Sequence, residues 1–311
     1  MRVFVTGASG FIGSAVVPEL LGAGHQVVGL ARSEEAAAAL AAAGAAVQRG
    51  ALDDLDCLRD GAASSDGVIH LAFKHDIAFS GNFQGAADAD LRAIETLGAA
   101  LAGSGRPLVI ASGLLGLTAG GMATERDMAD PSTGGPRAVS AQAALAFATQ
   151  GVRSSIVRLA PTVHDEGDHG FVAALIGIAR AKGVSGYIGA GANHWPAVHR
   201  RDAARLFRLA LEQAPAGAVL HGVADEGVPT REIAEVIGRQ LNVPTVAIPV
   251  EQAGEHFGWL AAFFGGNMLA SSTLTRQQFD WLPTHPGLIA DLELGHYFHN
   301  PTAQLAAVGA D

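Results

Sequence analysis

The chain has 311 residues, of which 49% are hydrophobic and 16% charged, a composition that excludes intrinsic disorder and suits a well-buried α/β protein. The net charge of −10 at pH 7 gives no reason to expect nucleic acid or an anionic membrane as a partner. Cys57 is the single cysteine, which excludes an internal disulfide. No apolar stretch reaches the roughly 20 residues that span a bilayer, and residues 2–5 run into a glycine loop instead of a signal peptide, so we expect a cytoplasmic protein.

Short apolar runs alternate with longer Ala- and Leu-rich segments in the first half of the chain. Strands are expected at Val3–Thr6, Gln26–Ala31, Ala46–Gln48, Gly67–Leu71, Leu108–Ala111 and Ser155–Leu159. Helices are expected between them at residues 11–23, 34–43, 55–62, 85–103 and 138–150. The alternation predicts right-handed βαβ units on a parallel sheet with helices on both faces, which is a Rossmann-type doubly wound α/β fold.

The pattern changes after residue 163. The segments expected there are a polar turn at His164–His169, a helix at 171–182, a glycine-rich stretch at 183–191, a helix at Arg201–Gln213, a strand at Ala218–Val223, and a helix at Thr230–Leu241 with Thr230 as N-cap. Residues 245–300 mix short helices and loops, and the tail after Pro301 is expected to be loosely held. We therefore expect a sheet domain from residues 1–163 and 195–224, and a smaller lobe from residues 164–194 and 225–311.

A glycine loop, Thr6–Gly13, lies between the first strand and the first helix. Gly7 permits a tight turn, Gly10 lets backbone N–H groups approach a pyrophosphate, and Gly13 lets the helix pack close to the sheet. The helix N-terminus adds partial positive charge. The sheet domain is therefore expected to bind a dinucleotide, with Ser9, Phe11 and Ile12 also contacting it.

The end of the second strand indicates which dinucleotide. An acidic residue there accepts a hydrogen bond from a ribose 2′-hydroxyl and repels a 2′-phosphate. Arg32 and Ser33 stand at this position instead and favour NADP(H) over NAD(H), and the less favoured alternative is that Arg32 is a solvated surface residue.

These residues resemble the extended, epimerase-like branch of the short-chain dehydrogenase/reductase superfamily, whose loop reads TGxxGxxG. Further segments resemble the family along nearly the whole chain. Asp53 and Leu55 resemble the segment that contacts the adenine, and His70-Leu71-Ala72 with Phe73 and Lys74 resembles the end of the fourth strand beside the cofactor. The segment Val157–Val163, with Pro161 and Val163, resembles the one that contacts the nicotinamide amide, and Trp195–Asp202 resembles a later family segment. Ser112 closes the fifth strand, where the family has its catalytic Ser. The smaller lobe would then bind the substrate.

The chain departs from the family at the active helix. It has two tyrosines, Tyr187 and Tyr297, and neither stands four residues before a lysine. Alignment places Arg137 at the family's Tyr position and Ala141 at its Lys position. The chain is thus similar to atypical subgroups that lack the Tyr-Lys pair.

Two residues are candidates for polarising a substrate. Arg137 stays protonated, so it cannot act as a general acid, but it could orient a substrate carboxylate or stabilise an oxyanion. A local hydrogen bond at a helix start is the alternative. Ser112 could donate a hydrogen bond to a substrate carbonyl, or it could be a simple turn residue.

Histidines are the candidates for the proton donor. His75 follows the fourth strand and is expected to titrate near neutrality, and His164 is the second candidate. Lys74 could replace the family's ribose-binding Lys, or it could point to solvent. His199 is expected to line the same cleft or to cap the helix near Arg201.

Two further segments have alternative readings. The loop His164–Gly170 carries two histidines and three carboxylates, but its ligands share one loop without helical spacing, so a polar substrate-facing loop is favoured over a metal site. The aromatic stretch Phe257–Phe264 could wall a hydrophobic pocket, but core packing is favoured.

The sequence therefore predicts an NADP(H)-dependent oxidoreductase that transfers hydride to a C=O, C=C or C=N bond of a small-molecule substrate. The alternatives are an NADP(H)-binding sensor or scaffold without catalysis and, ranked lower, a sugar-nucleotide epimerase or dehydratase. A homodimer could form through residues 85–103 and 138–150, although their Ala-rich faces could also pack internally.

Overall fold

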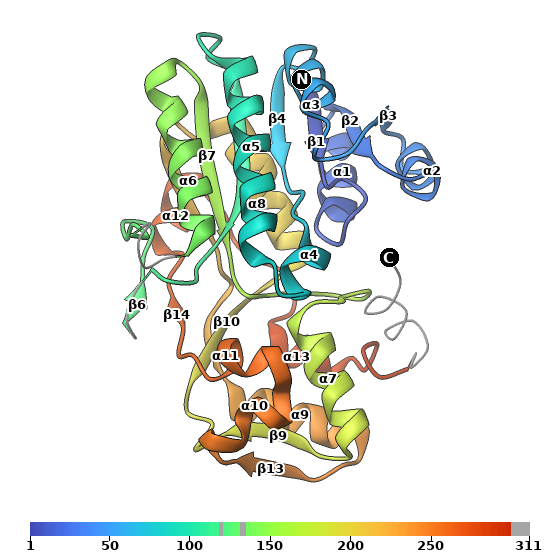
Figure 1. Cartoon of the computed structure of the whole chain (residues 1–311), viewed down its shortest axis with the longest axis vertical. Coiled ribbons are helices and arrows are strands. Elements are labelled where there is room, and N and C mark those ends of the chain that lie inside the picture. Colours follow the sequence, from blue (N-terminus) through green and yellow to red (C-terminus); the bar gives the residue numbers. More distant parts are fainter. Residues whose placement is uncertain (118–120, 131–134, 300–311) are drawn as a thin grey trace.

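The structure is a computed structural model that describes residues 1–117, 121–130 and 135–299 (Figure 1). Its centre is a seven-stranded parallel sheet with the strand order β11-β7-β5-β4-β1-β2-β3. The strands are β1 (Arg2–Thr6), β2 (Gln26–Ala31), β3 (Ala46–Arg49), β4 (Gly67–His70), β5 (Pro107–Gly113), β7 (Arg153–Leu159) and β11 (Ala218–Gly222). The strand order reverses between β1 and β4, the place where ligands bind in open α/β sheets.

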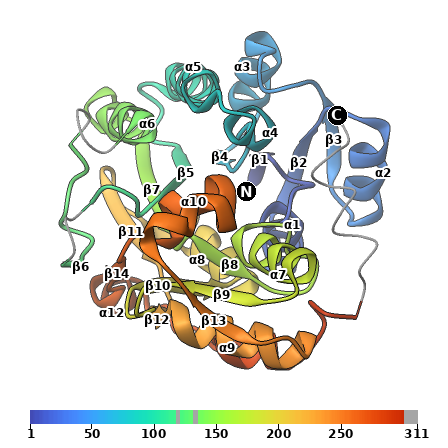
Figure 2. The same cartoon turned by 60° about the horizontal axis from the view of Figure 1, so that its bottom comes forward.

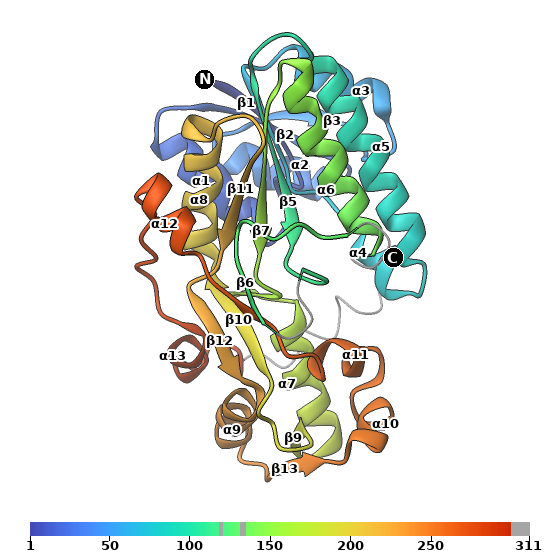
Figure 3. The same cartoon turned by 90° about the vertical axis from the view of Figure 1, so that its left-hand side faces the viewer.

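Helices cover both faces of this sheet. They are α1 (Gly13–Gly22), α2 (Glu34–Ala42), α3 (Leu55–Ala63), α4 (His75–Phe79), α5 (Phe83–Leu101), α6 (Pro136–Ala146) with the 3-10 turn η1 (Phe147–Gln150), and α8 (Arg200–Gln213). Figure 3 shows α5 and α6 on one side of the strands and α1 and α8 on the other. Side chains of β1 alternate accordingly, because Phe4 packs with the α5 side while Val3 and Val5 pack with the α1 side.

A smaller lobe lies beyond the carboxyl ends of the sheet strands, at the bottom of Figure 1. Its short sheets pair β8 (Thr162–His164), β10 (His194–His199) and β12 (Asp225–Pro229), then β9 (Ser185–Ile188) with β13 (Thr245–Ile248), and β6 (Met122–Ala123) with β14 (Leu269–Ala270). Its helices are α7 (Phe171–Lys182), α9 (Thr230–Leu241), α10 (Ala253–Phe257), α11 (Ala261–Phe264) and α13 (Leu288–Glu293), with 3-10 turns η2 (Val250–Gln252) and η3 (Gly258–Leu260). The remaining helix, α12 (Thr273–Phe279), lies beside the sheet domain. Figure 2 shows α7, α9 and α10 from below.

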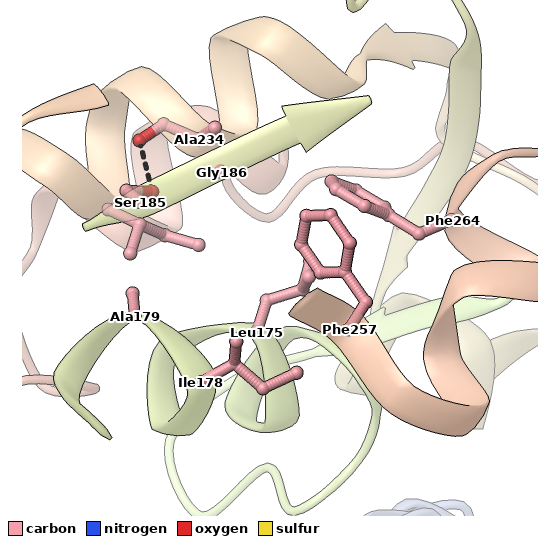
Figure 4. A pocket seen from close by; sticks show the side chains of 9 residues that line it. Leu175, Ile178, Ala179, Ser185, Gly186, Ala234, Phe257 and Phe264 are labelled. Atoms are coloured by element: carbon pink, nitrogen blue, oxygen red, sulfur yellow. Dashed lines mark hydrogen bonds between the residues drawn. The ribbon is translucent and has the colours of Figure 1, made fainter. Parts of the chain in front are cut away.

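The lobe has its own apolar core, in which Trp195, Phe257 and Phe264 are buried. A small void between α7, β9, α9 and α10 has room for about 10 Å³, roughly one water molecule (Figure 4). On its wall the Ser185 hydroxyl donates to the Ala234 carbonyl at 2.7 Å. The void is too small to hold a substrate.

The C-terminal region also returns to the large sheet. Helix α12 packs against α8 and β11, and the indole N–H of Trp281 donates to the Asp202 carbonyl at 3.0 Å. Residues 273–281 therefore lie beside the sheet domain, although the sequence suggested only residues 1–163 and 195–224 for it. The expected loose tail after Pro301 lies outside the described residues.

Two local expectations differ from the structure. Thr230 is the first residue of α9, and Pro229 occupies the N-cap position. The hydroxyl of Thr230 donates instead to the side-chain oxygen of Asn193 at 2.7 Å, a tertiary bond that the local pattern could not indicate. The glycine-rich stretch contains strand β9, because its backbone pairs with β13 from much later in the chain.

Within the described ranges, no helix has both the length and the apolar character required to cross a membrane.

Candidate active site

The loop between β1 and α1 has no space for side chains at two glycines. Gly7 has a φ of +66°, and a Cβ there would lie 2.7 Å from the backbone nitrogen of Ala72. A Cβ on Gly13 would lie 2.1 Å from the Gly7 carbonyl oxygen. Ser9 and Gly10 are exposed at the start of α1, and Phe11 and Ile12 are half-buried. Exposed backbone at a helix N-terminus fits the pyrophosphate of a dinucleotide.

Arg200, which the sequence reasoning did not single out, holds this loop from the side of the lobe. Its guanidinium lies 4.6 Å from the centroid of the Phe11 ring and donates to the Phe11 carbonyl at 3.4 Å. It also donates to the Asp165 carboxylate at 3.0 Å. The signal in the sequence was its place in the Trp195–Asp202 segment, where Arg200 is the first residue of α8.

Basic residues gather at the end of β2. Arg32 is exposed there, and Ser33 caps α2 by accepting a hydrogen bond from the Ala36 N–H at 3.1 Å. Arg49, at the end of the neighbouring β3, donates to the Ser33 carbonyl at 2.6 Å and pairs with Glu34 at 2.9 Å. Arg49 was missed because only the fold brings β3 beside β2.

The residues expected beside the cofactor follow β4. Leu71, Ala72 and Phe73 are half-buried, and the Ala72 N–H donates to Thr6 Oγ1 at 3.3 Å. Lys74 forms an ion pair with Asp53, so these two candidates are brought together. Pro161 and Val163 are also half-buried and lie where the chain leaves β7 and enters β8.

Arg137 is the centre of the substrate-side cluster. It lies in the first turn of α6, whose N-terminus is formed by Gly135 (φ 75°) and Pro136. Its Nη2 donates to the Ala111 carbonyl at 2.9 Å, next to the partly exposed Ser112 at the end of β5. Its guanidinium carbon lies 4.2 Å from the centroid of the Phe73 ring.

His75 belongs to the same cluster. Its ring lies 5.0 Å from the Phe73 ring, and its charge interactions include those with Arg137 and His169. Burial, followed by the nearby Arg137 and His169, lowers the pKa of His75 to about 4. The pKa of His75 is therefore lower than the value near neutrality that we expected. Neighbouring groups surround the ring although the residue as a whole is exposed, so solvent weakens this shift.

His164 lies elsewhere, in the junction between the sheet domain and the lobe. It is fully buried, and its Nδ1 lies 2.8 Å from a carboxylate oxygen of Asp291 in α13. Its ring packs edge-on against that of His199, at 5.5 Å between centroids. His199 caps α8 by accepting from the Arg201 N–H at 3.2 Å, which is one of its two expected roles. His164 has the environment of a packed core residue, which makes it a poorer proton donor than His75.

The polar loop after β8 is held mainly by internal bonds. The Tyr297 hydroxyl donates to Asp168 at 3.0 Å, and burial raises the pKa of both groups. His169 is the exposed histidine of this loop, and its ring lies 5.8 Å from the Phe11 ring. His169 is thus nearer to the glycine loop than the His164 that sequence reasoning chose.

Carboxylates and imidazoles also meet in the junction, because ligand-type atoms of Asp165, His199 and Asp291 lie within 4.8 Å of one another. Hydrogen bonds already use several of the ligand-type atoms of this group. Asp165 accepts from Arg200, and His199 Nδ1 accepts from Arg201. These bonds describe a hydrogen-bonded cluster better than a metal site.

The large side chains of the aromatic stretch pack mainly in the core of the lobe. Phe257, Leu260 and Phe264 are buried in the lobe core, while Trp259 is 46% exposed. Ala261 and Ala262 line an open hollow of about 550 Å³ together with Gly189–Asn193 and Val250. Core packing therefore accounts for the large side chains.

Comparison with known proteins fits this geometry. Residues 3–221 match the NAD dependent epimerase/dehydratase family. An uncharacterized protein of Schizosaccharomyces pombe is 51% identical over 96% of this chain and 100% of its own length, and one of Saccharomyces cerevisiae is 46% identical over 95% and 99%. Among solved structures, the UDP-glucose 4-epimerase of Thermotoga maritima has a TM-score of 0.77 at 19% identity, covering 96% of this chain and 98% of that one.

The chain therefore belongs to the NAD dependent epimerase/dehydratase family, within the extended short-chain dehydrogenase/reductase superfamily. It has the Rossmann-like fold of that superfamily. The family supports an oxidoreductase-like enzyme.

Proposed function

We propose that this protein is an NADP(H)-dependent oxidoreductase that transfers hydride to a C=O, C=C or C=N bond of a small organic substrate. One observation carries the proposal: the glycine loop and the cluster of Arg137, His75 and Ser112 stand at the same carboxyl edge of the sheet. Ligands of open α/β sheets bind at this edge.

The glycine loop and its neighbours would hold the dinucleotide. Ser9 and Gly10 leave backbone exposed for the pyrophosphate, Gly7 and Gly13 have no room for a side chain, and the segments Leu71–Lys74 and Pro161–Val163 flank the nicotinamide end. Arg32, Ser33 and Arg49 offer donors for a ribose 2′-phosphate, which supports NADP(H) over NAD(H). When bound, the cofactor supplies the hydride.

The chain's own residues would prepare the acceptor. Ser112 donates a hydrogen bond to the heteroatom of the reducible bond, and the Arg137 guanidinium stabilises the negative charge that develops there or pairs with a substrate carboxylate. His75 is neutral at pH 7 because its pKa is about 4, so it contributes a hydrogen bond. The proton that completes the reduction then comes from solvent water at neutral pH, and from the His75 imidazolium only as the pH falls.

Turnover of purified protein tests this function. NADPH oxidation would be followed at saturating cofactor with aldehydes, ketones, enones and imines, each with and without a carboxylate. We expect at least one class to be reduced, and faster with NADPH than with NADH. NADPH binding without oxidation across all four classes would contradict the proposal and favour the sensor alternative.

Epimerisation or dehydration is the second candidate, favoured by the family to which the chain belongs. Both reactions need transient hydride removal, for which the superfamily ordinarily uses the Tyr that is replaced by Arg137. Incubation with UDP-glucose and analysis of the nucleotide sugars distinguishes them. Conversion without net change in NADPH would favour the epimerase.

A further inference from the structure

The ends of two neighbouring strands place Asp165 and Arg200 side by side. Strands β8 and β10 are parallel and pair His164 with His199, so the residues that follow these two strands emerge next to each other. Asp165 Oδ2 accepts hydrogen bonds from Arg200 Nη2 at 3.0 Å and from Arg200 Nε at 3.3 Å. The side chains of Arg200 and Asp165 are only 18% and 12% exposed, so solvent screens this ion pair weakly. Asp165 therefore fixes the direction in which the Arg200 side chain points.

The Arg200 side chain points to the first turn of α1. Arg200 is the first residue of α8, which packs against α1 (Figure 3). Its Nη1 donates to the Phe11 carbonyl and to the Ser14 hydroxyl oxygen, both at 3.4 Å, and its guanidinium carbon lies 4.6 Å from the centroid of the Phe11 ring. The His169 ring contacts the same phenyl ring at 5.8 Å between centroids. The turn Phe11–Ser14 is therefore held from outside by Arg200 and by the polar loop after β8.

This outside support replaces a cap that α1 does not provide itself. The N-cap position of α1 is Ile12, which makes no side-chain hydrogen bond to the helix. A guanidinium has donors and no acceptor, so Arg200 binds the carbonyl and hydroxyl oxygens of the turn and leaves its backbone N–H groups to another partner. A cation at a helix N-terminus is unfavourable by itself and favours an anion there. The arrangement thus suits a phosphate group that accepts from the N–H groups at the start of α1.

We propose that Arg200 is a positioning residue for the cofactor. Held by Asp165, it fixes the turn Phe11–Ser14 so that the backbone N–H groups at the start of α1 are in place for the pyrophosphate. The inference rests on the proposed function only where the glycine loop receives a dinucleotide, and it requires neither hydride transfer nor a preference for NADP(H). It also makes Asp165, which follows strand β8 of the lobe, a determinant of cofactor affinity.

The dinucleotide affinity of the full-length protein tests this role. The dissociation constants of NADPH, NADH and ADP-ribose would be measured by isothermal titration in wild type and in Arg200→Met, because all three ligands carry the pyrophosphate. We expect Arg200→Met to weaken the binding of all three by the same factor, about tenfold or more. A residue that acted on the 2′-phosphate or on the nicotinamide would change the three affinities unequally.

Arg208 provides the matched control, because it joins the same two helices away from the glycine loop. Its side chain is 22% exposed and donates to Glu19 of α1 at 2.7 Å. Arg208→Met should lower the free energy of unfolding in urea and leave the three dissociation constants within about twofold of wild type. A general loosening of the contact between α1 and α8 would instead weaken binding equally in Arg200→Met and Arg208→Met.

A double-mutant cycle tests the contribution of Asp165. Asp165→Asn keeps a side-chain oxygen that can accept the Glu166 N–H, but it loses the charge that holds Arg200. We expect this variant to weaken dinucleotide binding by about threefold or more. It should add little in the Arg200→Met background, because both substitutions remove the same contact. Asp165→Asn is also the second variant if Arg200→Met does not fold.

Three outcomes would overturn the proposal. One is affinities within about twofold of wild type in Arg200→Met and Asp165→Asn. The second is equal weakening of binding in Arg208→Met, and the third is full additivity in the double variant. A wild type that binds none of the three ligands would contradict both the proposal and the dinucleotide site. A wild type that binds them but reduces no acceptor contradicts the proposed function alone, because the affinities remain measurable.

Discussion

The guanidinium carbon of Arg137 lies 4.2 Å from the centroid of the Phe73 ring, so the first turn of α6 is stacked on the segment that follows β4. This contact brings Arg137, which the sequence alignment assigns to the family's Tyr position, to the carboxyl edge of the sheet. It also places a fixed positive charge there, since Nη2 is held by the Ala111 carbonyl. The site is thereby suited to negative charge on the acceptor.

Removing this charge should impair turnover without affecting the cofactor. Arg137→Met keeps an unbranched apolar side chain on the Phe73 ring, and we expect kcat/KM to fall by about 100-fold or more, as for loss of an oxyanion donor. The dissociation constant of NADPH, measured by fluorescence titration, should stay within about threefold. Arg126→Met, at an exposed position, is the control. An unchanged kcat/KM in Arg137→Met would remove Arg137 from the site.

The glycine loop offers a matched pair of substitutions. A Cβ in Gly13→Ala would collide with the Gly7 carbonyl at 2.1 Å, so NADPH binding should be lost or the protein strongly destabilised. Gly22→Ala changes the other end of the same helix, where nothing lies within 4 Å. It should stabilise the protein by about 0.5–1 kcal/mol and leave binding intact. Isothermal titration measures NADPH binding and urea unfolding measures stability in both variants. Normal NADPH binding by Gly13→Ala would contradict the assignment of the cofactor to the glycine loop.

Cofactor preference should depend on Arg32. If this side chain binds the 2′-phosphate, Arg32→Ala should weaken NADPH binding by about tenfold or more and leave NADH binding unchanged. Arg59→Ala, which removes a similarly exposed arginine from α3, should change neither. Equal weakening of both cofactors by Arg32→Ala would argue against the preference for NADP(H).

Acid should destabilise the protein partly through His199. Burial is the main cause that lowers the pKa of His199 to about 4, against an ordinary 6.5. Between pH 6.5 and 4 the unfolded chain therefore binds a proton that the folded protein does not, and stability is lost as the pH falls through this window. The loss has an upper limit of about 3 kcal/mol.

Urea unfolding at pH 7 and pH 5 in wild type and His199→Asn measures this contribution. The Asn side-chain oxygen can still accept the Arg201 N–H, so the cap of α8 is kept. We expect a smaller drop in unfolding free energy between the two pH values in the variant. Equal drops would show that His199 does not carry the acid sensitivity.

The sheet domain was predictable because its determinants are local. Runs such as Gln26–Ala31 coincide with observed strands. The spacing of the glycines in the TGxxGxxG loop also predicts the positions at which the structure has no room for a side chain. The lobe was less predictable because its strands pair over long distances, as β9 does with β13. Thr230 shows the same limit, since its partner Asn193 comes from another segment.

In the candidate site, too, local sequence features were predictable and contacts between distant segments were not. Arg137 was found from its alignment with the family's Tyr, but its contacts with Phe73 and the Ala111 carbonyl were not, because only the fold brings α6 beside these segments. The burial of His164 depends on Asp291, which lies 127 residues later. Likewise, His75 was expected to titrate near neutrality because the sequence shows neither the desolvation of its ring nor the neighbouring Arg137 charge, which together lower its pKa.

The most direct test of the central claim is transfer of deuterium from NADPH labelled at nicotinamide C4 to an acceptor, detected by mass spectrometry of the product. The account predicts labelled product with wild type and with Arg126→Met, and little or none with Arg137→Met, although all three bind NADPH. Absence of label with every acceptor in wild type would contradict hydride transfer. Full labelling by Arg137→Met would contradict the role given to Arg137.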